Sequence, residues 1–139
     1  MGRAFGETCR DAIREFFEIR RDIAIEQAWV YGQQRVSSED VLRVAEACLD
    51  PIKAHHQDGH DEMLGIAEGA GMTLAEIVAL NGLTDIRDVL AWKGDLDSLG
   101  GCSAFITQSD TTSDGALLCG QTWDLATNNM PYVLGVHRQ

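Results

Sequence analysis

The stretch Ser98 to Thr107, which reads SLGGCSAFIT, marks the point at which the hydrophobic pattern of the chain changes period. Before it, apolar residues recur every three to four positions, which is the period of an amphipathic helix. After it, short apolar runs at 104–107 and 116–121 are separated by the turn-rich segment 109–115, a pattern that predicts a β-hairpin. A helical front followed by strands predicts an α+β fold.

Five helices are predicted ahead of this boundary. Their ranges are 6–31, stopped by Gly32; Ser37 or Ser38 to about Ile52, with a boundary or kink at Pro51; 61–68, broken by Gly69 to Gly71; 73–80; and 84–92, capped by Thr84 and Asp85. The serine at the start of the second helix is a preferred N-cap residue. Thr73 and Glu76 have the spacing of a capping box, in which each side chain bonds the other's backbone amide.

The predicted sheet is too small to stand alone. A third strand is predicted from Pro131 to Val136, but two or three strands leave open edges and bury little apolar area. We therefore expect the rest of the sheet to come from more of the same protein, with another chain as the alternative. On this interpretation the 139 residues are the first portion of a longer protein, and the open edges also allow a homo-oligomer.

Composition excludes several classes of function. The chain has a formal charge of −11, which disfavours nucleic-acid binding. No run approaches the roughly 18 apolar residues of a membrane span, and the opening residues lack the apolar core of a signal peptide. The four cysteines, at 9, 48, 102 and 119, include no C-x-x-C pair, which disfavours a zinc site. We expect a cytoplasmic protein with reduced thiols, no metal and no cofactor.

A polar patch at 55–60 lies between the second and third predicted helices. Together with the first residues of the third helix it is the one candidate for metal binding, with His55, His56, Asp58, His60, Asp61 and Glu62 as possible ligands. Pairs four or five residues apart within it could serve as ligands, but the spacing fits a zinc site loosely. We interpret the patch as a solvated loop between helices.

Cys102 is the strongest candidate for chemistry because it follows two glycines where the helices give way to strands. Gly100 and Gly101 let the backbone approach a reacting carbonyl group closely. The Cys102 thiol could then attack the Gly101 carbonyl to form a thioester, which water would hydrolyse. The new chain would begin at Cys102, whose α-amino group, with a pKa of about 7.7–8.0, would act as general base for its own thiol. The alternative is a buried structural thiol behind a flexible hinge.

Hairpin geometry adds a second candidate. If the turn is centred near Thr112, paired residue numbers sum to about 224, which sets Cys102 opposite Thr122 and within reach of Asp124. The Asp124 carboxylate could orient the amino group of Cys102, as the third member of a catalytic triad does, or it could cap a turn. The same register leaves Cys102 about three residues out of alignment with Cys119, which disfavours a disulfide between them.

Four ordered blocks of sequence resemble the acyl-coenzyme A:6-aminopenicillanic acid acyltransferases (isopenicillin N acyltransferases) of the N-terminal nucleophile (Ntn) hydrolase superfamily. They are EMLGIAEGAG at 62–71, EIVALNGLTD at 76–85, GCSA at 101–104 and GQTWD at 120–124, and the opening GRAFG at 2–6 is similar to the start of the family's N-terminal region. The resemblance implies an αββα sandwich made as a proenzyme that cuts itself between Gly101 and Cys102. The implied domains are a helical pro-segment or small subunit, 1–101, and the first strands of the nucleophile-bearing subunit, 102–139.

The resemblance also implies an activity, that of an amide (C–N) hydrolase or acyltransferase. Cys102 would form the acyl-enzyme with its α-amino group as base, and Asp124 matches the acidic residue near the family's nucleophile. The substrate would be a small-molecule amide or acyl compound. The chain departs from the penicillin enzymes where Ser103 and Ala104 replace a hydroxyl pair and Asp85 replaces glutamate, so penicillin is not the expected substrate.

Two further expectations follow. In the family, the oxyanion hole and much of the substrate pocket come from later parts of the chain, so we expect the 139 residues to be inactive alone. The rival hypothesis is non-catalytic: an acidic helical module that uses its apolar faces and exposed strand edge to bind a partner or to dimerise.

Overall fold

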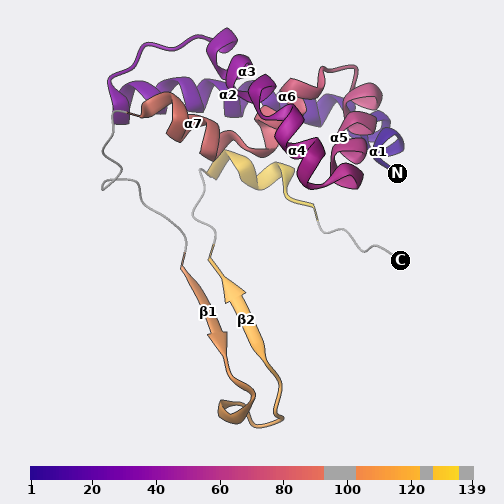
Figure 1. The fold of residues 1–139 in the computed structure, drawn as a ribbon, viewed down its shortest axis with the longest axis vertical. Helices are drawn as coiled ribbons and strands as arrows, with labels where there is room; N and C mark the ends of the chain where they lie inside the picture. The colour runs from indigo at the N-terminus through magenta and orange to yellow at the C-terminus, as the bar shows by residue number, and fades with distance from the viewer. Residues whose placement is uncertain (93–102, 123–126, 135–139) are drawn as a thin grey trace. The chain divides into compact units, whose positions relative to one another are not determined.

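The chain divides into two compact units, Met1–Gly94 and Asp95–Gln139. The computed structural model describes residues 1–92, 103–122 and 127–134. Helices make up the described part of the first unit, and the second carries a two-stranded antiparallel sheet (Figure 1). This composition agrees with the predicted α+β class. The predicted boundary between residues 101 and 102 lies outside the described residues.

The described residues form the following elements. The first unit contains α1 (Gly2–Thr8), α2 (Arg10–Gly32), α3 (Ser38–Ala47), α4 (Leu49–His55), α5 (Gln57–Ala70), α6 (Leu74–Asn81) and α7 (Leu83–Ala91). The second contains the strands β1 (Ala104–Thr107) and β2 (Leu118–Gln121), with the 3-10 helices η1 (Ser109–Thr111) and η2 (Thr127–Tyr132). The prediction of a third strand is wrong for its described part, because residues 131–132 belong to η2 and 133–134 have no regular structure.

Capping boxes start two of the helices. At α6, the Thr73 hydroxyl accepts a hydrogen bond from the Glu76 amide at 3.2 Å, and the Glu76 carboxylate accepts one from the Thr73 amide at 2.7 Å. At α3, Ser37 and Asp40 make the same pair of bonds, at 3.3 Å and 2.7 Å. The predicted capping box at Thr73 is confirmed. The N-cap of α3, predicted as Ser37 or Ser38, is Ser37.

Thr73→Ala is expected to lower the free energy of unfolding by about 1 kcal/mol, because alanine leaves the Glu76 amide without its acceptor. Urea unfolding followed by far-ultraviolet circular dichroism measures the change. The matched control is Thr84→Ala. Thr84 was predicted to cap the last helix, but it lies inside α7, whose N-cap is Gly82. An equal loss in both variants would contradict the capping role of Thr73.

The first predicted helix is divided in the structure. It breaks at Cys9, between α1 and α2, where the sequence contains neither glycine nor proline. Its C-terminal end also differs from the prediction, because Gln33 adopts the left-handed conformation (φ 53°) while Gly32 remains helical. A Cβ added to Gly32 would lie 2.7 Å from the Cα of Ala91. Glycine is therefore needed at this position for close packing of α2 on α7.

The middle of the helical unit contains two more corrections. The second predicted helix breaks at Cys48, and Pro51 lies in the first turn of α4, where a missing N–H costs no helical hydrogen bond. The interpretation of the histidine patch as a loop is wrong. Helix α4 extends to His55 and α5 begins at Gln57, so His56 alone separates them.

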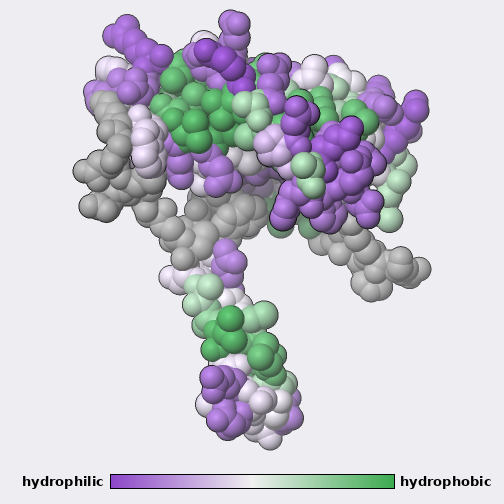
Figure 2. Space-filling model, viewed as in Figure 1, coloured by the Kyte–Doolittle hydropathy of each residue, from purple (hydrophilic) through white to green (hydrophobic). Residues whose placement is uncertain are grey.

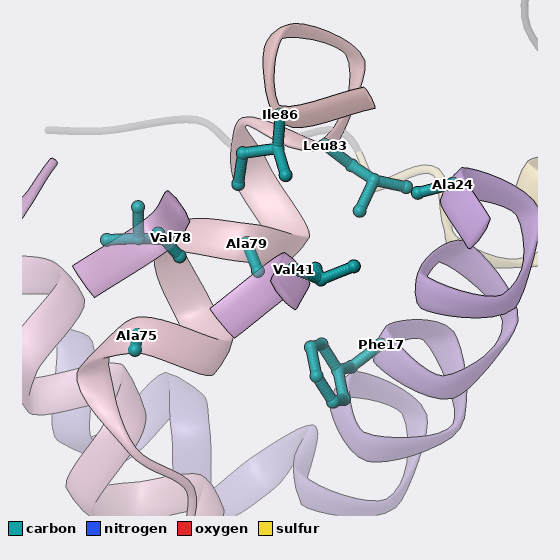
Figure 3. Close-up of a cluster of buried hydrophobic side chains, with 9 residues drawn as sticks. Phe17, Ala24, Val41, Ala75, Val78, Ala79, Leu83 and Ile86 are labelled. Atoms are coloured by element: carbon teal, nitrogen blue, oxygen red, sulfur yellow. The ribbon is translucent and has the colours of Figure 1, made fainter. Parts of the chain in front are cut away.

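Two clusters of buried apolar side chains hold the helical unit together. The larger lies between α2, α3, α6 and α7 (Figure 3) and comprises Phe17, Ala24, Val41, Ala45, Ala75, Val78, Ala79, Leu83 and Ile86. The smaller joins α2, α5 and α6 through Ile13, Ala67, Ala70 and Ile77. Because alanine is common in both clusters, the helices approach one another closely, and a larger side chain would overpack the core.

Glycines allow α1 and α5 to lie backbone against backbone. Gly2 and Gly6 on α1 meet Gly65 and Gly69 on α5, and the spacing of four residues puts each pair on one face of its helix. A Cβ added to Gly69 would lie 2.7 Å from a backbone nitrogen of α1. A Cβ added to Gly6 would lie 2.9 Å from a backbone nitrogen of α5. The contact therefore leaves no room for a side chain at either position.

Arginines of α2 bind the C-terminal end of α5. Arg10 donates from Nε and Nη2 to the carbonyl oxygen of Gly69, at 3.1 Å and 2.9 Å, and Arg14 donates to that of Gly71 at 3.1 Å. These carbonyl groups lie at the C-terminal end of the helix, where they lack intrahelical donors and where positive charge is favourable. Helix α5 is thus fixed on one side by α1 and at its end by α2.

Candidate active site

The three residues predicted to carry the chemistry, Gly101, Cys102 and Asp124, lie outside the described residues. The structure describes their neighbours. Ser103 directly follows Cys102, and Thr122 stands two positions before Asp124. Ser103 and Thr122 lie opposite each other just beyond the end of the β-ladder, where they are joined by hydrogen bonds.

The hairpin register differs by one residue from the prediction. Ala104 pairs with Gln121 and Thr107 with Leu118, so paired residue numbers sum to 225. The segment 108–117 therefore holds an even number of residues, and the centre of the hairpin lies between residues 112 and 113 and not at Thr112. A shift of one residue changes every pairing. Thr122 therefore lies opposite Ser103, and the predicted pairing of Cys102 with Thr122 is wrong.

Thr122 binds both backbone groups of Ser103. The Thr122 amide donates to the carbonyl oxygen of Ser103 at 2.8 Å, and the Ser103 amide donates to the Thr122 hydroxyl at 3.0 Å. In a regular hydrogen-bonded pair of antiparallel strands, the second bond would go to the carbonyl of the facing residue. A side-chain oxygen thus replaces a backbone acceptor at the residue that follows Cys102. The sequence alone assigns Thr122 no role, because this contact depends on the register of the strands.

Thr107 makes a similar contact at the opposite end of the ladder. Its hydroxyl accepts a hydrogen bond from the Leu118 amide at 3.3 Å and lies 3.4 Å from the Leu118 carbonyl oxygen. Cys119, also on β2, is a free and exposed thiol that pairs with Ile106. The prediction that Cys102 and Cys119 form no disulfide stays a prediction, because Cys102 lies outside the described residues.

Both faces of the hairpin are apolar. Phe105 and Leu118 lie on one face and Ile106 and Cys119 on the other, as the register and the alternation of side chains along a strand require. Phe105 is 59% exposed and Ile106 is 73% exposed. Figure 2 shows hydrophobic residues in the middle of the hairpin and hydrophilic ones at its tip. Strands that are apolar on both faces are typical of sheets covered on both sides.

The histidine-rich corner between α4 and α5 is held by local bonds. The His56 ring nitrogen Nδ1 accepts a hydrogen bond from the Gly59 amide at 2.7 Å, which caps α5. His60 Nδ1 lies 3.0 Å from the Asp61 carboxylate, and this hydrogen bond lowers the pKa of Asp61 below its ordinary value. Across residues 1–92, 103–122 and 127–134, no group of three or more His, Cys, Asp or Glu side chains could hold a metal ion.

Comparison with protein-family models, with curated proteins and with solved structures gives no match to this chain. The resemblance to the Ntn acyltransferases therefore rests on the sequence blocks alone.

In the part of the chain that the structure describes, no single helix has the length and apolarity to cross a membrane. Helices α5 and α6 have that length and apolarity only when they are taken together, and the pair is bent by 113° at the break between them.

Proposed function

We propose that this chain comprises the helical segment and first strands of an Ntn-type cysteine amidohydrolase or acyltransferase. It would cut itself between Gly101 and Cys102 and belong to an αββα sandwich. The observation that carries the proposal is a hairpin that begins two residues after Cys102 and is apolar on both faces. A sandwich needs such strands, because its sheets are covered by a helical layer on one face and by the other sheet on the second.

Self-cleavage needs no other reactant than water. The Cys102 sulfur attacks the Gly101 carbonyl carbon, a C–S bond forms, the C–N bond to Cys102 breaks and the amine nitrogen takes up the thiol proton. Water then attacks the thioester. The products are a carboxylate at Gly101 and a free thiol and amine, both on Cys102.

The same residue would then process substrate. The α-amino group of Cys102 takes the thiol proton as the sulfur attacks a substrate amide, and it passes that proton to the departing amine. Water or a second amine receives the acyl group from the sulfur, which makes the enzyme a hydrolase or a transferase. In this proposal the Asp124 carboxylate orients the amino group. The substrate class is a small-molecule amide, and the compartment we propose is the cytoplasm.

Self-cleavage is expected when the full-length gene product is purified and incubated, because the Cys102 thiol has a glycine carbonyl beside it. Intact mass spectrometry should find two fragments whose masses sum to that of the precursor plus one water. N-terminal sequencing of the second fragment should start with Cys102, Ser103 and Ala104. A product that remains one chain with unchanged mass would contradict the proposal.

A second function, binding of a partner or of another copy, is favoured by the same exposed apolar faces of the hairpin. A thiol-selective probe distinguishes the two functions. A nucleophile with its own base should be labelled faster than Cys48, which packs against the larger core cluster. Equal labelling of Cys102 and Cys48 would favour the binding module.

A further inference from the structure

Arg20 lies on the buried face of helix α2, where a charged side chain is costly. Its position falls between Phe17 and Ala24, two members of the larger core cluster, at the spacing of residues that share one face of a helix. Only 7% of the residue is exposed. Arginines with so little exposure are almost always paired with an opposite charge.

Among the side chains that the structure describes, no carboxylate pairs with Arg20. The Nε atom of its guanidinium group is buried and donates no hydrogen bond. Burial lowers the pKa of this guanidinium below its ordinary value, and no neighbouring charge offsets the effect. The ring of Phe16 lies against the group, with 5.4 Å between the guanidinium carbon and the ring centroid, but a ring offers no oxygen to accept a hydrogen bond.

The neighbouring Arg21 shows how an arginine of this helix binds carboxylates within its reach. Its Nη2 atom lies 2.5 Å from the Glu18 carboxylate and 2.8 Å from that of Asp22. Burial lowers the pKa of Arg21, but the hydrogen bonds to Asp22 and Glu18 raise it overall. The two acidic residues nearest to Arg20 in sequence are therefore already engaged, and the charge that balances Arg20 has to come from elsewhere.

We propose that Arg20 is the binding group of an anion site in the helical unit, which takes a small oxyanion, a carboxylate or a phosphate. A guanidinium group presents neighbouring N–H groups as a planar fork that fits two oxygens of either ligand. The ligand is small because Nε is buried, so the surface of another protein cannot approach it. The site belongs to the first unit and does not depend on the proposed cleavage at Cys102.

Thermal unfolding of the parent chain in sodium phosphate, and in sodium chloride of the same ionic strength, tests for the site. Phosphate is expected to raise the melting temperature saturably, by about 5–10 °C at about a hundred times the dissociation constant, because a ligand bound only by the folded state stabilises that state. The formal charge of −11 disfavours a general attraction of anions, so a saturable response indicates a specific site. Sodium acetate in the same titration distinguishes a carboxylate site from one that needs phosphate.

Arg20→Met removes the charge and keeps a long, flexible side chain. In chloride it is expected to melt about 5 °C above the parent, because it relieves the burial of an unpaired charge. Phosphate should then raise its melting temperature no more than chloride does. Arg20→Lys keeps the charge without the planar fork and should bind phosphate at least about tenfold more weakly.

Arg21→Met is the matched control, because it removes the adjacent arginine, whose charge is already paired. It should not melt above the parent in chloride, and it should respond to phosphate as the parent does.

The site is overturned if the parent melts at the same temperature in phosphate, acetate and chloride, or if Arg20→Met responds to phosphate as strongly as the parent. A melting temperature that rises with protein concentration and ignores both anions also overturns it, since that result indicates a carboxylate from a second copy of the chain. The titration of the parent requires no variant, so it decides the inference even if Arg20→Met fails to fold.

Discussion

Gly69→Leu is expected to lower the free energy of unfolding by about 3 kcal/mol, because it drives a side chain into the backbone of α1. Even a Cβ at Gly69 would lie 2.7 Å from a backbone nitrogen of α1. The neighbouring helix offers no flexible side chain that could move aside. The chain can relieve the clash only by separating α1 from α5, which exposes the glycine faces of both helices.

Urea unfolding followed by circular dichroism measures this loss, with Gly69→Ala as an intermediate member of the series. Gly82→Ala is the matched control, since a Cβ there would lie 3.4 Å from the nearest atom, an ordinary contact. It should cost less than Gly69→Ala, with any loss limited to the exchange of glycine for alanine at the N-cap of α7. A Gly69→Leu protein that unfolds at the parent's urea concentration would show that α1 does not pack against α5.

The helical unit was predictable from sequence where the cause is local. The capping box of Thr73 and Glu76 needs only residues three apart, and it was found correctly. The break at Cys9 has no local signal, because neither glycine nor proline occurs there. The role of Gly32 was also misassigned. Its missing side chain makes room for Ala91, nearly sixty residues away in sequence, and no local pattern reports such a contact.

In the hairpin, the position of the first strand was predictable from sequence, but the pairing of the two strands was not. The strand at 104–107 was predicted from its apolar run, but the register was missed by one residue because the conformation of the loop decides it. The error matters for the candidate site, since it moves Thr122 from Cys102 to Ser103. The bond between the Thr122 hydroxyl and the Ser103 amide depends on that register, and the sequence alone could not indicate it.

Cys102→Ala is expected to abolish cleavage of the full-length gene product, because the methyl group of alanine cannot attack the Gly101 carbonyl. Cys102→Ser should cleave more slowly than the parent, since a hydroxyl at its ordinary pKa is a weaker nucleophile than a thiol. Intact mass spectrometry over a time course measures all three rates. The expected order is therefore cysteine, then serine, with no product from alanine.

Cys119→Ser is the control for this series, since Cys119 is an exposed thiol in the second unit of the chain. In the observed register it faces Ile106, and the proposed mechanism gives its thiol no part, so its loss should leave the rate unchanged. Cleavage that persists in Cys102→Ala would require another nucleophile or a contaminating protease. That result would remove the chemical basis of the proposed enzyme and leave the hairpin's apolar faces to be explained by partner binding.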